Sequence, residues 1–209
     1  MVWKPRSSQV AWIKAWVFLL CLVPLARLVY GGVANSLGAN PLETITRSTG
    51  WWTLFLLMTT LTVTPLRRLA GAPWLLKLRR MTGLFAFFYA SIHLLTFVWF
   101  DHWFDLAAIL KDVIKRPFVT VGFAAYLLLL PLALTSTNRL VRRLGRNWQR
   151  LHRLVYAIAI LGVIHFWWLV KRDLTEPLAF ALVLAFLLGI RFFWRARTIR
   201  AAVPSQVQQ

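Results

Sequence analysis

Histidine is the residue type whose positions in this chain suggest chemistry. The 209 residues contain four histidines, and two of them, His93 and His165, each interrupt a long apolar stretch. A polar imidazole is costly inside a membrane, so its presence there suggests a functional site. Imidazole nitrogens are also common ligands of metal ions, including haem iron. Two such rings at one depth could clamp a planar haem between two helices.

His93 and His165 are predicted to lie at the same depth in a membrane. His93 follows Arg80 by thirteen residues, and His165 follows Arg153 by twelve. At about 1.5 Å per residue, both rings would lie roughly 18–20 Å from the basic ends of their helices. The pair therefore predicts a six-coordinate haem b with iron held by His93 and His165, a centre suited to passing single electrons. The alternative is that each histidine only hydrogen-bonds a neighbouring helix.

His152 precedes His165 by thirteen residues on the same predicted helix. A second haem between the same two helices would need a partner near position 79 or 80, and these positions hold Arg79 and Arg80. The expectation is one haem, or two if the second has an unusual ligand. His152 could ligate that second cofactor, hydrogen-bond a haem propionate or a quinone, or extend to water.

Several arginines near His152 could hold an anionic group, although arginines at such positions also set membrane orientation. These arginines are Arg79, Arg80, Arg150 and Arg153. The sequence contains no C-x-x-C-H motif and no glycine-rich nucleotide loop, and its one cysteine, Cys21, lies in an apolar stretch. His102 is expected at a membrane interface. No catalytic residue is assigned.

The composition indicates a membrane protein. Hydrophobic residues make up 59% of the chain, the mean hydropathy is +0.64, and the net charge is +19. A disordered polycation would not carry 12 Trp and 15 Phe. Six stretches approach the length needed to cross a bilayer: 10–30, 50–66, 81–100, 117–134, 151–170 and 177–194. We expect an all-α, polytopic bundle of six transmembrane helices, forming a single domain over residues 1–209 with no obvious internal repeat. The first stretch is the weakest, and a cleaved signal peptide is its alternative.

The distribution of charge predicts which side each connection faces. With the N-terminus cytoplasmic, the inner segments carry 18 basic residues and no acidic residue, whereas the outer segments carry seven basic residues and all six acidic ones. This distribution obeys the positive-inside rule and places both termini in the cytoplasm. Membrane orientation therefore explains the positive charge without nucleic-acid binding. The outer loop 101–116 could hold an amphipathic helix on the membrane surface. Three acids in this loop form a candidate docking surface for a partner: Asp101, Asp105 and Asp112.

Several motifs together resemble one known family. They are Arg79-Arg80-x-x-Gly83-Leu84, Tyr89-x-x-x-His93, Pro131-Leu132-Ala133-Leu134-Thr135-Ser136, and Leu151-His152-Arg153-Leu154-Val155-Tyr156 leading to His165-Phe166-x-Trp168. The chain is similar over nearly its whole length to the MsrQ (YedZ) family, which is related to the membrane domains of ferric reductases and NADPH oxidases. The motif around His152 and His165 is the most specific part of the resemblance.

The resemblance implies a function beyond what spacing can indicate. It implies a haem b subunit of the bacterial inner membrane with an associated FMN, which takes electrons from quinol. These electrons would pass to MsrP, a periplasmic molybdopterin enzyme that reduces methionine sulfoxide and so repairs oxidised periplasmic proteins. The family's histidines correspond to His93, His152 and His165, whereas the wider superfamily has a fourth histidine that is absent here. Two alternatives remain: a stand-alone ferric or oxygen reductase fed by a cytosolic flavoprotein, and a haem-free transporter or assembly factor.

Overall fold

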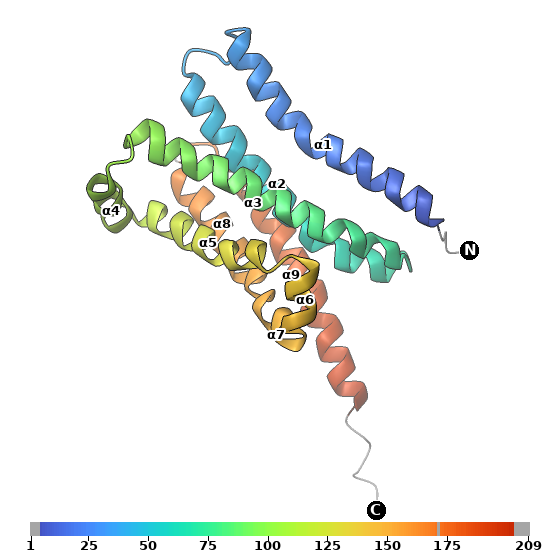
Figure 1. Cartoon of the computed structure of the whole chain (residues 1–209). Helices are drawn as coiled ribbons and strands as arrows, with labels where there is room; N and C mark the ends of the chain where they lie inside the picture. The colour runs from blue at the N-terminus through green and yellow to red at the C-terminus, as the bar shows by residue number, and fades with distance from the viewer. Residues whose placement is uncertain (1–4, 171, 203–209) are drawn as a thin grey trace, which may run out of the picture.

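The computed structural model describes residues 5–170 and 172–202, and within these ranges every regular element is a helix. The long helices pack side by side as a bundle (Figure 1). In chain order the elements are α1 (Ser7–Val33), α2 (Pro41–Leu69), η1 (Pro73–Leu75), α3 (Leu76–Thr96), η2 (Phe97–Asp101), α4 (Leu106–Lys115), α5 (Pro117–Leu134), α6 (Asn138–Leu144), α7 (Arg146–Leu151), α8 (Leu154–Leu169) and α9 (Thr175–Ala202). Lys171 of an outer loop and the tail from residue 203 lie outside the described residues.

The predicted all-α, polytopic architecture is confirmed. The described chain contains five helical segments that are long and apolar enough to cross a membrane: Ser7–Val33, Pro73–Asp101, Pro117–Leu134, Arg146–Leu169 and Thr175–Thr198. The remaining predicted span, 50–66, lies within α2, which has 29 residues but does not reach the same hydropathy. Its five threonines between positions 53 and 64 lower its hydropathy. Six crossings and the cytoplasmic placement of the termini therefore stay predictions.

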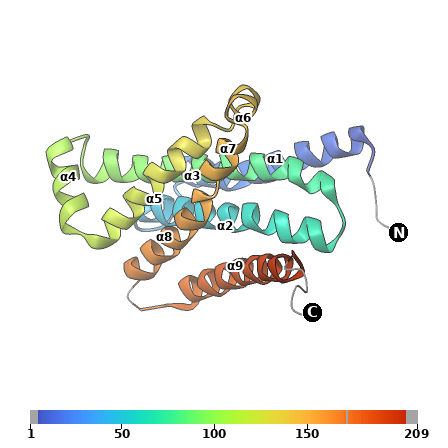
Figure 2. The same cartoon turned by 90° about the horizontal axis from the view of Figure 1, so that it is seen from below.

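The two ends of the bundle differ in the connections that they carry. The beginning of α1 and the end of α9 lie at one end, which we call the basic end because it also holds the arginine-rich connections around residues 67–80 and 135–153 (Figures 1 and 2). Helix α4 lies at the opposite end, which we call the outer end. An even number of crossings would produce this arrangement.

Two antiparallel helix pairs form the centre of the bundle. Helix α2 packs most extensively on α3, and α5 packs most extensively on α8. The pairs meet where α3 contacts α5 and α2 contacts α8, while α9 covers α2 and α8. Fully buried residues at these contacts include Leu61, Ala86 and Ala159. Each pair therefore contributes one histidine-bearing helix to the middle of the protein. Helix α3 carries His93, and α8 carries His165.

A buried tyrosine attaches α1 to this centre. The Tyr89 hydroxyl donates a hydrogen bond to the Cys21 carbonyl (2.7 Å) and accepts one from the Leu25 amide (3.2 Å). These two backbone groups would otherwise bond each other within α1, so the hydroxyl is inserted into the helix's own hydrogen-bond series. Pro24 lies in the same turn and already weakens that series. Tyr89 thus holds α1 against α3 one turn away from His93.

An arginine attaches α9 to α2 in a comparable way. Pro65 has no amide hydrogen, so the Leu61 carbonyl four residues earlier lacks its normal helical donor. Arg191 of α9 donates Nη2 to this carbonyl and Nη1 to the Leu187 carbonyl (2.6 Å), and its guanidinium lies 5.7 Å from the centre of the Tyr156 ring. The sequence counts Arg191 only as one more basic residue near the C-terminus, whereas the structure makes it a helix-to-helix contact.

The outer end contains the predicted amphipathic helix, α4, but not a free acidic cluster. Asp105 caps the start of α4 by accepting bonds from the amides of residues 107 and 108. One Asp112 carboxylate oxygen lies 3.2 Å from His102 Nε2 and 3.3 Å from Arg116 Nη1. Two of the three acids proposed for partner docking are therefore occupied by contacts within the chain.

Candidate functional site

His93 of α3 and His165 of α8 face each other in the middle of the bundle. Their ring centres are 6.1 Å apart and the ring planes cross at 80°. They come from different helix pairs, so the contact between α3 and α5 and that between α2 and α8 fix their separation. The structure brings together the two histidines that the depth comparison selects. We call them the paired imidazoles.

Each of the paired imidazoles has one nitrogen fixed by a backbone carbonyl. His93 Nδ1 lies 2.9 Å from the Thr46 carbonyl oxygen, and His165 Nδ1 lies 2.7 Å from the Phe118 carbonyl oxygen. A carbonyl can only accept, so in both rings Nδ1 carries the hydrogen and donates it. The Nε2 atom of each neutral ring then keeps its lone pair for a metal ion. A histidine ligand oriented through its second nitrogen is the usual arrangement at metal sites.

A glycine makes room for each ring. A Cβ atom placed on Gly50 would lie 3.0 Å from His93 Cε1, and one placed on Gly122 would lie 2.7 Å from His165 Nδ1. Each glycine follows by four residues the residue whose carbonyl binds the ring, Thr46 or Phe118. A helical side chain covers the turn that precedes it, so a glycine also leaves that carbonyl accessible. Each glycine therefore leaves room for the histidine ring and keeps the carbonyl accessible to the ring's hydrogen bond.

Each of the paired imidazoles, with its carbonyl and its glycine, forms what we call a half-site. The two half-sites repeat along the chain. The carbonyl, the glycine and the histidine of the second half-site each follow their counterparts in the first by the same 72 residues. No repeat is obvious in the sequence, because the surrounding side chains differ. Thr46, Gly50, Phe118 and Gly122 were missed for this reason. A search for equal spacing between glycines and the two histidines could have found them.

The paired imidazoles fit the two axial positions of one haem iron. An imidazole nitrogen lies about 2 Å from a bound transition metal, so two rings opposed across one ion have centres roughly 6 Å apart. The observed separation is 6.1 Å. Among the described residues, no three side chains of the types His, Cys, Asp and Glu gather to hold a metal ion. Two nitrogens suit haem iron, whose other four ligands belong to the porphyrin.

His152 has different surroundings. It lies at the break between α7 and α8, outside the regular part of either helix. Its Nε2 is 3.1 Å from the Thr135 hydroxyl, and its ring stacks on Trp148 with centres 3.9 Å apart. Trp148 Nε1 in turn donates to the Thr135 carbonyl (3.0 Å).

The four candidate arginines do not converge on His152. Arg79 is close enough to act on it electrostatically. Arg80 instead donates to the Asn138 side chain, and Arg150 and Arg153 are exposed. Arg79 is therefore the arginine that could lie opposite His152. Among the described residues, a second imidazole does not lie there.

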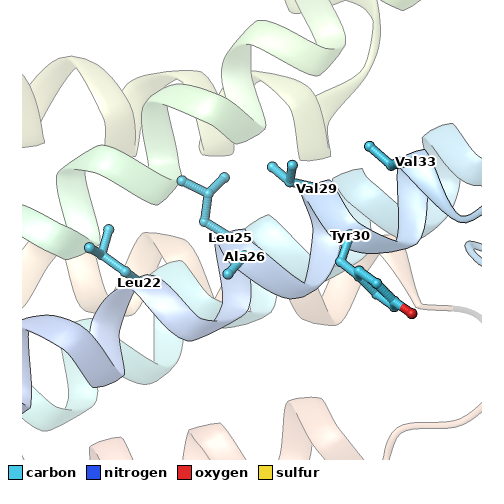
Figure 3. A pocket seen from close by; sticks show the side chains of 6 residues that line it. All are labelled: Leu22, Leu25, Ala26, Val29, Tyr30 and Val33. Carbon is cyan, nitrogen blue, oxygen red and sulfur yellow. The ribbon is translucent and has the colours of Figure 1, made fainter.

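A large groove on α1 has no connection with this chemistry. It has a volume of about 530 Å³, and its lining side chains all come from α1 (Figure 3): Leu22, Leu25, Ala26, Val29, Tyr30 and Val33. The Tyr30 hydroxyl is the one polar side-chain group among these six. An apolar surface of this kind suits lipid chains in a membrane.

Comparison with known proteins supports a membrane redox assignment. The sequence model of the family described as "Ferric reductase like transmembrane component" matches residues 49–163, which include both half-sites except Thr46 and the second histidine. The chain is 54% identical to the protein-methionine-sulfoxide reductase heme-binding subunit MsrQ of Herminiimonas arsenicoxydans, over 93% of this chain and 90% of that protein.

Other relatives agree with this similarity. Proteins of the same name are 53% identical in Ralstonia nicotianae, over 94% of this chain and 91% of the relative, and 48% identical in Xanthomonas campestris pv. campestris, over 91% and 90%. No solved structure matches the chain.

Proposed function

The chain belongs to the ferric reductase-like transmembrane family and, within it, to the MsrQ family, and from this premise we propose that it is a haem b electron-transfer subunit of a methionine sulfoxide reductase system. Haem b, when bound, accepts and releases one electron at a time. The paired imidazoles are the observation that carries the proposal. Their separation, their fixed Nδ1 atoms and their two glycines suit axial ligation of one iron.

In this proposal the protein residues hold the cofactor and keep its surroundings rigid. His93 and His165 supply Nε2, while Thr46 and Phe118 fix the ring orientation through their carbonyl groups. Iron held by both histidines would have no position left for small molecules such as oxygen. Rigid ligands also reduce the structural change that accompanies each electron transfer.

The remaining assignments follow from the family. Electrons come from quinol in the bacterial inner membrane and go to an MsrP-like periplasmic molybdopterin subunit, which reduces oxidised methionine in periplasmic proteins. FMN is a further cofactor. His152 and Arg79 are assigned to an anionic group at the basic end, such as a haem propionate or flavin phosphate. The protein is then an electron-transfer subunit rather than the catalytic one.

An absorption spectrum of the purified full-length chain tests this function. We expect a Soret band and, after reduction with dithionite, a sharp α-band. Haem and flavin analysis of the same sample should give about one haem per polypeptide, as two axial histidines require. A preparation that folds as a helical protein but shows neither band, even after haem is supplied during expression, would contradict the proposal.

A further inference from the structure

A second groove lies between α2 and α9. Its volume is about 440 Å³, a size typical of small-molecule sites. Nine residues line it: Trp51, Phe55, Met58, Thr59, Thr62, Glu176, Ala179, Phe180 and Val183. Phe55 and Val183 are each more than a third exposed, so the groove opens sideways toward the membrane. Unlike the groove on α1, it combines aromatic, hydroxyl and carboxylate groups.

Three aromatic side chains line this groove: Trp51, Phe55 and Phe180. The rings of Trp51 and Phe55 are stacked with centres 5.2 Å apart and planes within 11° of parallel. Phe180 meets Trp51 edge to face at 5.7 Å. A planar ring could stack on Trp51 and Phe55 while an aliphatic tail follows Met58 and Val183 into the membrane.

The threonine and glutamate side chains of the groove offer hydrogen-bond acceptors. Thr59 and Thr62 donate their hydroxyl hydrogens to carbonyls of their own helix, so their oxygens remain able to accept. Glu176, in the first turn of α9, contributes a carboxylate at the outer end. A ligand that matches this set must donate hydrogen bonds from an otherwise apolar, planar ring.

The groove also adjoins both half-sites. Trp51 follows Gly50, which contacts the His93 ring. Phe180 meets Phe166 edge to face at 6.1 Å, and Phe166 follows His165. One layer of residues therefore separates the groove from each of the paired imidazoles.

We propose that the groove between α2 and α9 binds a membrane quinol, with the ring on Trp51 and Phe55 and a hydroxyl donated to Glu176. A quinol has the planar ring, the two donors and the long apolar tail that these side chains suit. On oxidation it loses two electrons and two protons to become a quinone. A bound haem b would accept the two electrons one at a time and be reoxidised between them, and Glu176 would accept the protons and release them to outer water. The role of haem as acceptor rests on the proposed function.

Photolabelling tests the location. The full-length chain in lipid nanodiscs would be irradiated with an azido-substituted short-chain ubiquinone, and the labelled peptides mapped by mass spectrometry. We expect label within residues 51–62 and 176–183, and displacement by unlabelled quinone but not by phospholipid. Label on α1 instead, or displacement by phospholipid as readily as by quinone, would overturn the proposal.

Two substitutions form a matched pair for this experiment. Ala179→Trp fills the groove between α2 and α9, whereas Ala26→Trp fills the groove on α1 by the same change. We expect A179W to lower labelling about tenfold and A26W to leave it within about twofold. An unchanged dithionite-reduced α-band shows that A179W is folded. Equal labelling of the two variants, with that band intact, would refute the site.

Glu176→Gln tests the proton path separately. It keeps the shape of the groove and a hydrogen-bond acceptor, so labelling should stay within about twofold, but quinol-driven haem reduction should slow about tenfold because the proton acceptor is lost. An unchanged rate would remove Glu176 from the proposal. Labelling in the groove without any haem reduction by quinol would instead contradict the proposed function and leave the binding site in place.

Discussion

The paired imidazoles lie on α3 and α8, whereas His152 lies closer to the basic end, at the break between α7 and α8. Near the outer end, an imidazole stands on each helix, and each ring is fixed at Nδ1 with a glycine opposite it. Near the basic end, His152 lies just before α8, whereas the residue 72 positions earlier is Arg80 of α3. Here the histidine Nε2 is itself hydrogen-bonded, to Thr135.

The difference shows that the neighbours of a histidine, more than the residue type, determine whether it can ligate. A ring held at Nδ1 offers Nε2 to a metal, whereas a ring held at Nε2 with no facing imidazole has a structural or anion-binding environment. The helix break at His152 also ends the repeat, because α3 runs unbroken through Arg80.

Removal of either of the paired imidazoles should have the largest effect. His93→Ala or His165→Ala removes an axial nitrogen, and we expect bound low-spin haem to fall by more than about tenfold. The pyridine haemochrome assay and the reduced α-band measure this. Full low-spin haem in both variants would show that the axial pair is elsewhere.

Gly122→Ala should have the next largest effect. Its new Cβ would lie 2.7 Å from His165 Nδ1, so the ring must move and its bond to Phe118 must break. We expect haem content to fall several-fold, approaching the roughly tenfold loss typical of disrupted ligand orientation. Gly189→Ala is the control, because nothing lies within 4 Å of that position. Equal haem content in the two variants would contradict the role of the glycine.

Tyr89→Phe should have a smaller effect, on stability more than on haem. It removes the hydroxyl that bonds Cys21 and Leu25, and loss of these buried bonds should cost about 1–3 kcal/mol of folding free energy. The thermal midpoint of the detergent-solubilised protein should fall, while haem content stays within about twofold. A loss of haem as large as that of H165A would mean that α1 is part of the haem site.

His152→Phe should have the smallest effect on haem. Phenylalanine keeps the stacking on Trp148 but loses the hydrogen bond to Thr135, worth about 1 kcal/mol. Haem content per polypeptide should remain within about twofold of the unsubstituted chain. If half or more of the haem is lost while His165→Ala retains its haem, the two regions have been assigned the wrong way round.

The sequence predicted the helices well because long apolar runs must form helices in a membrane. The predicted span 117–134 coincides with α5, and the depth comparison selected the two histidines that meet. The second span was harder to predict, because α2 is held in the bundle by contacts with α3 and has a lower hydropathy than the other spans.

Other features could not be predicted because they depend on contacts between distant helices. The roles of Gly50 and Gly122 depend on histidines of other helices that pack against them, and the local sequence does not show this contact. The role of Arg191 depends on Pro65 of another helix, which leaves the Leu61 carbonyl without its helical donor. Asp112 is not free for a partner because α4 places it beside His102 and Arg116.

The contact between Arg191 and Leu61 has a consequence for the order of synthesis. Helix α2 is among the first to leave the ribosome, and α9 is the last. Until α9 arrives, the Leu61 carbonyl has no donor in the least apolar of the long helices. The early helix is completed by the late one, so a chain truncated before α9 would expose this defect to the proteases that remove unfinished membrane proteins.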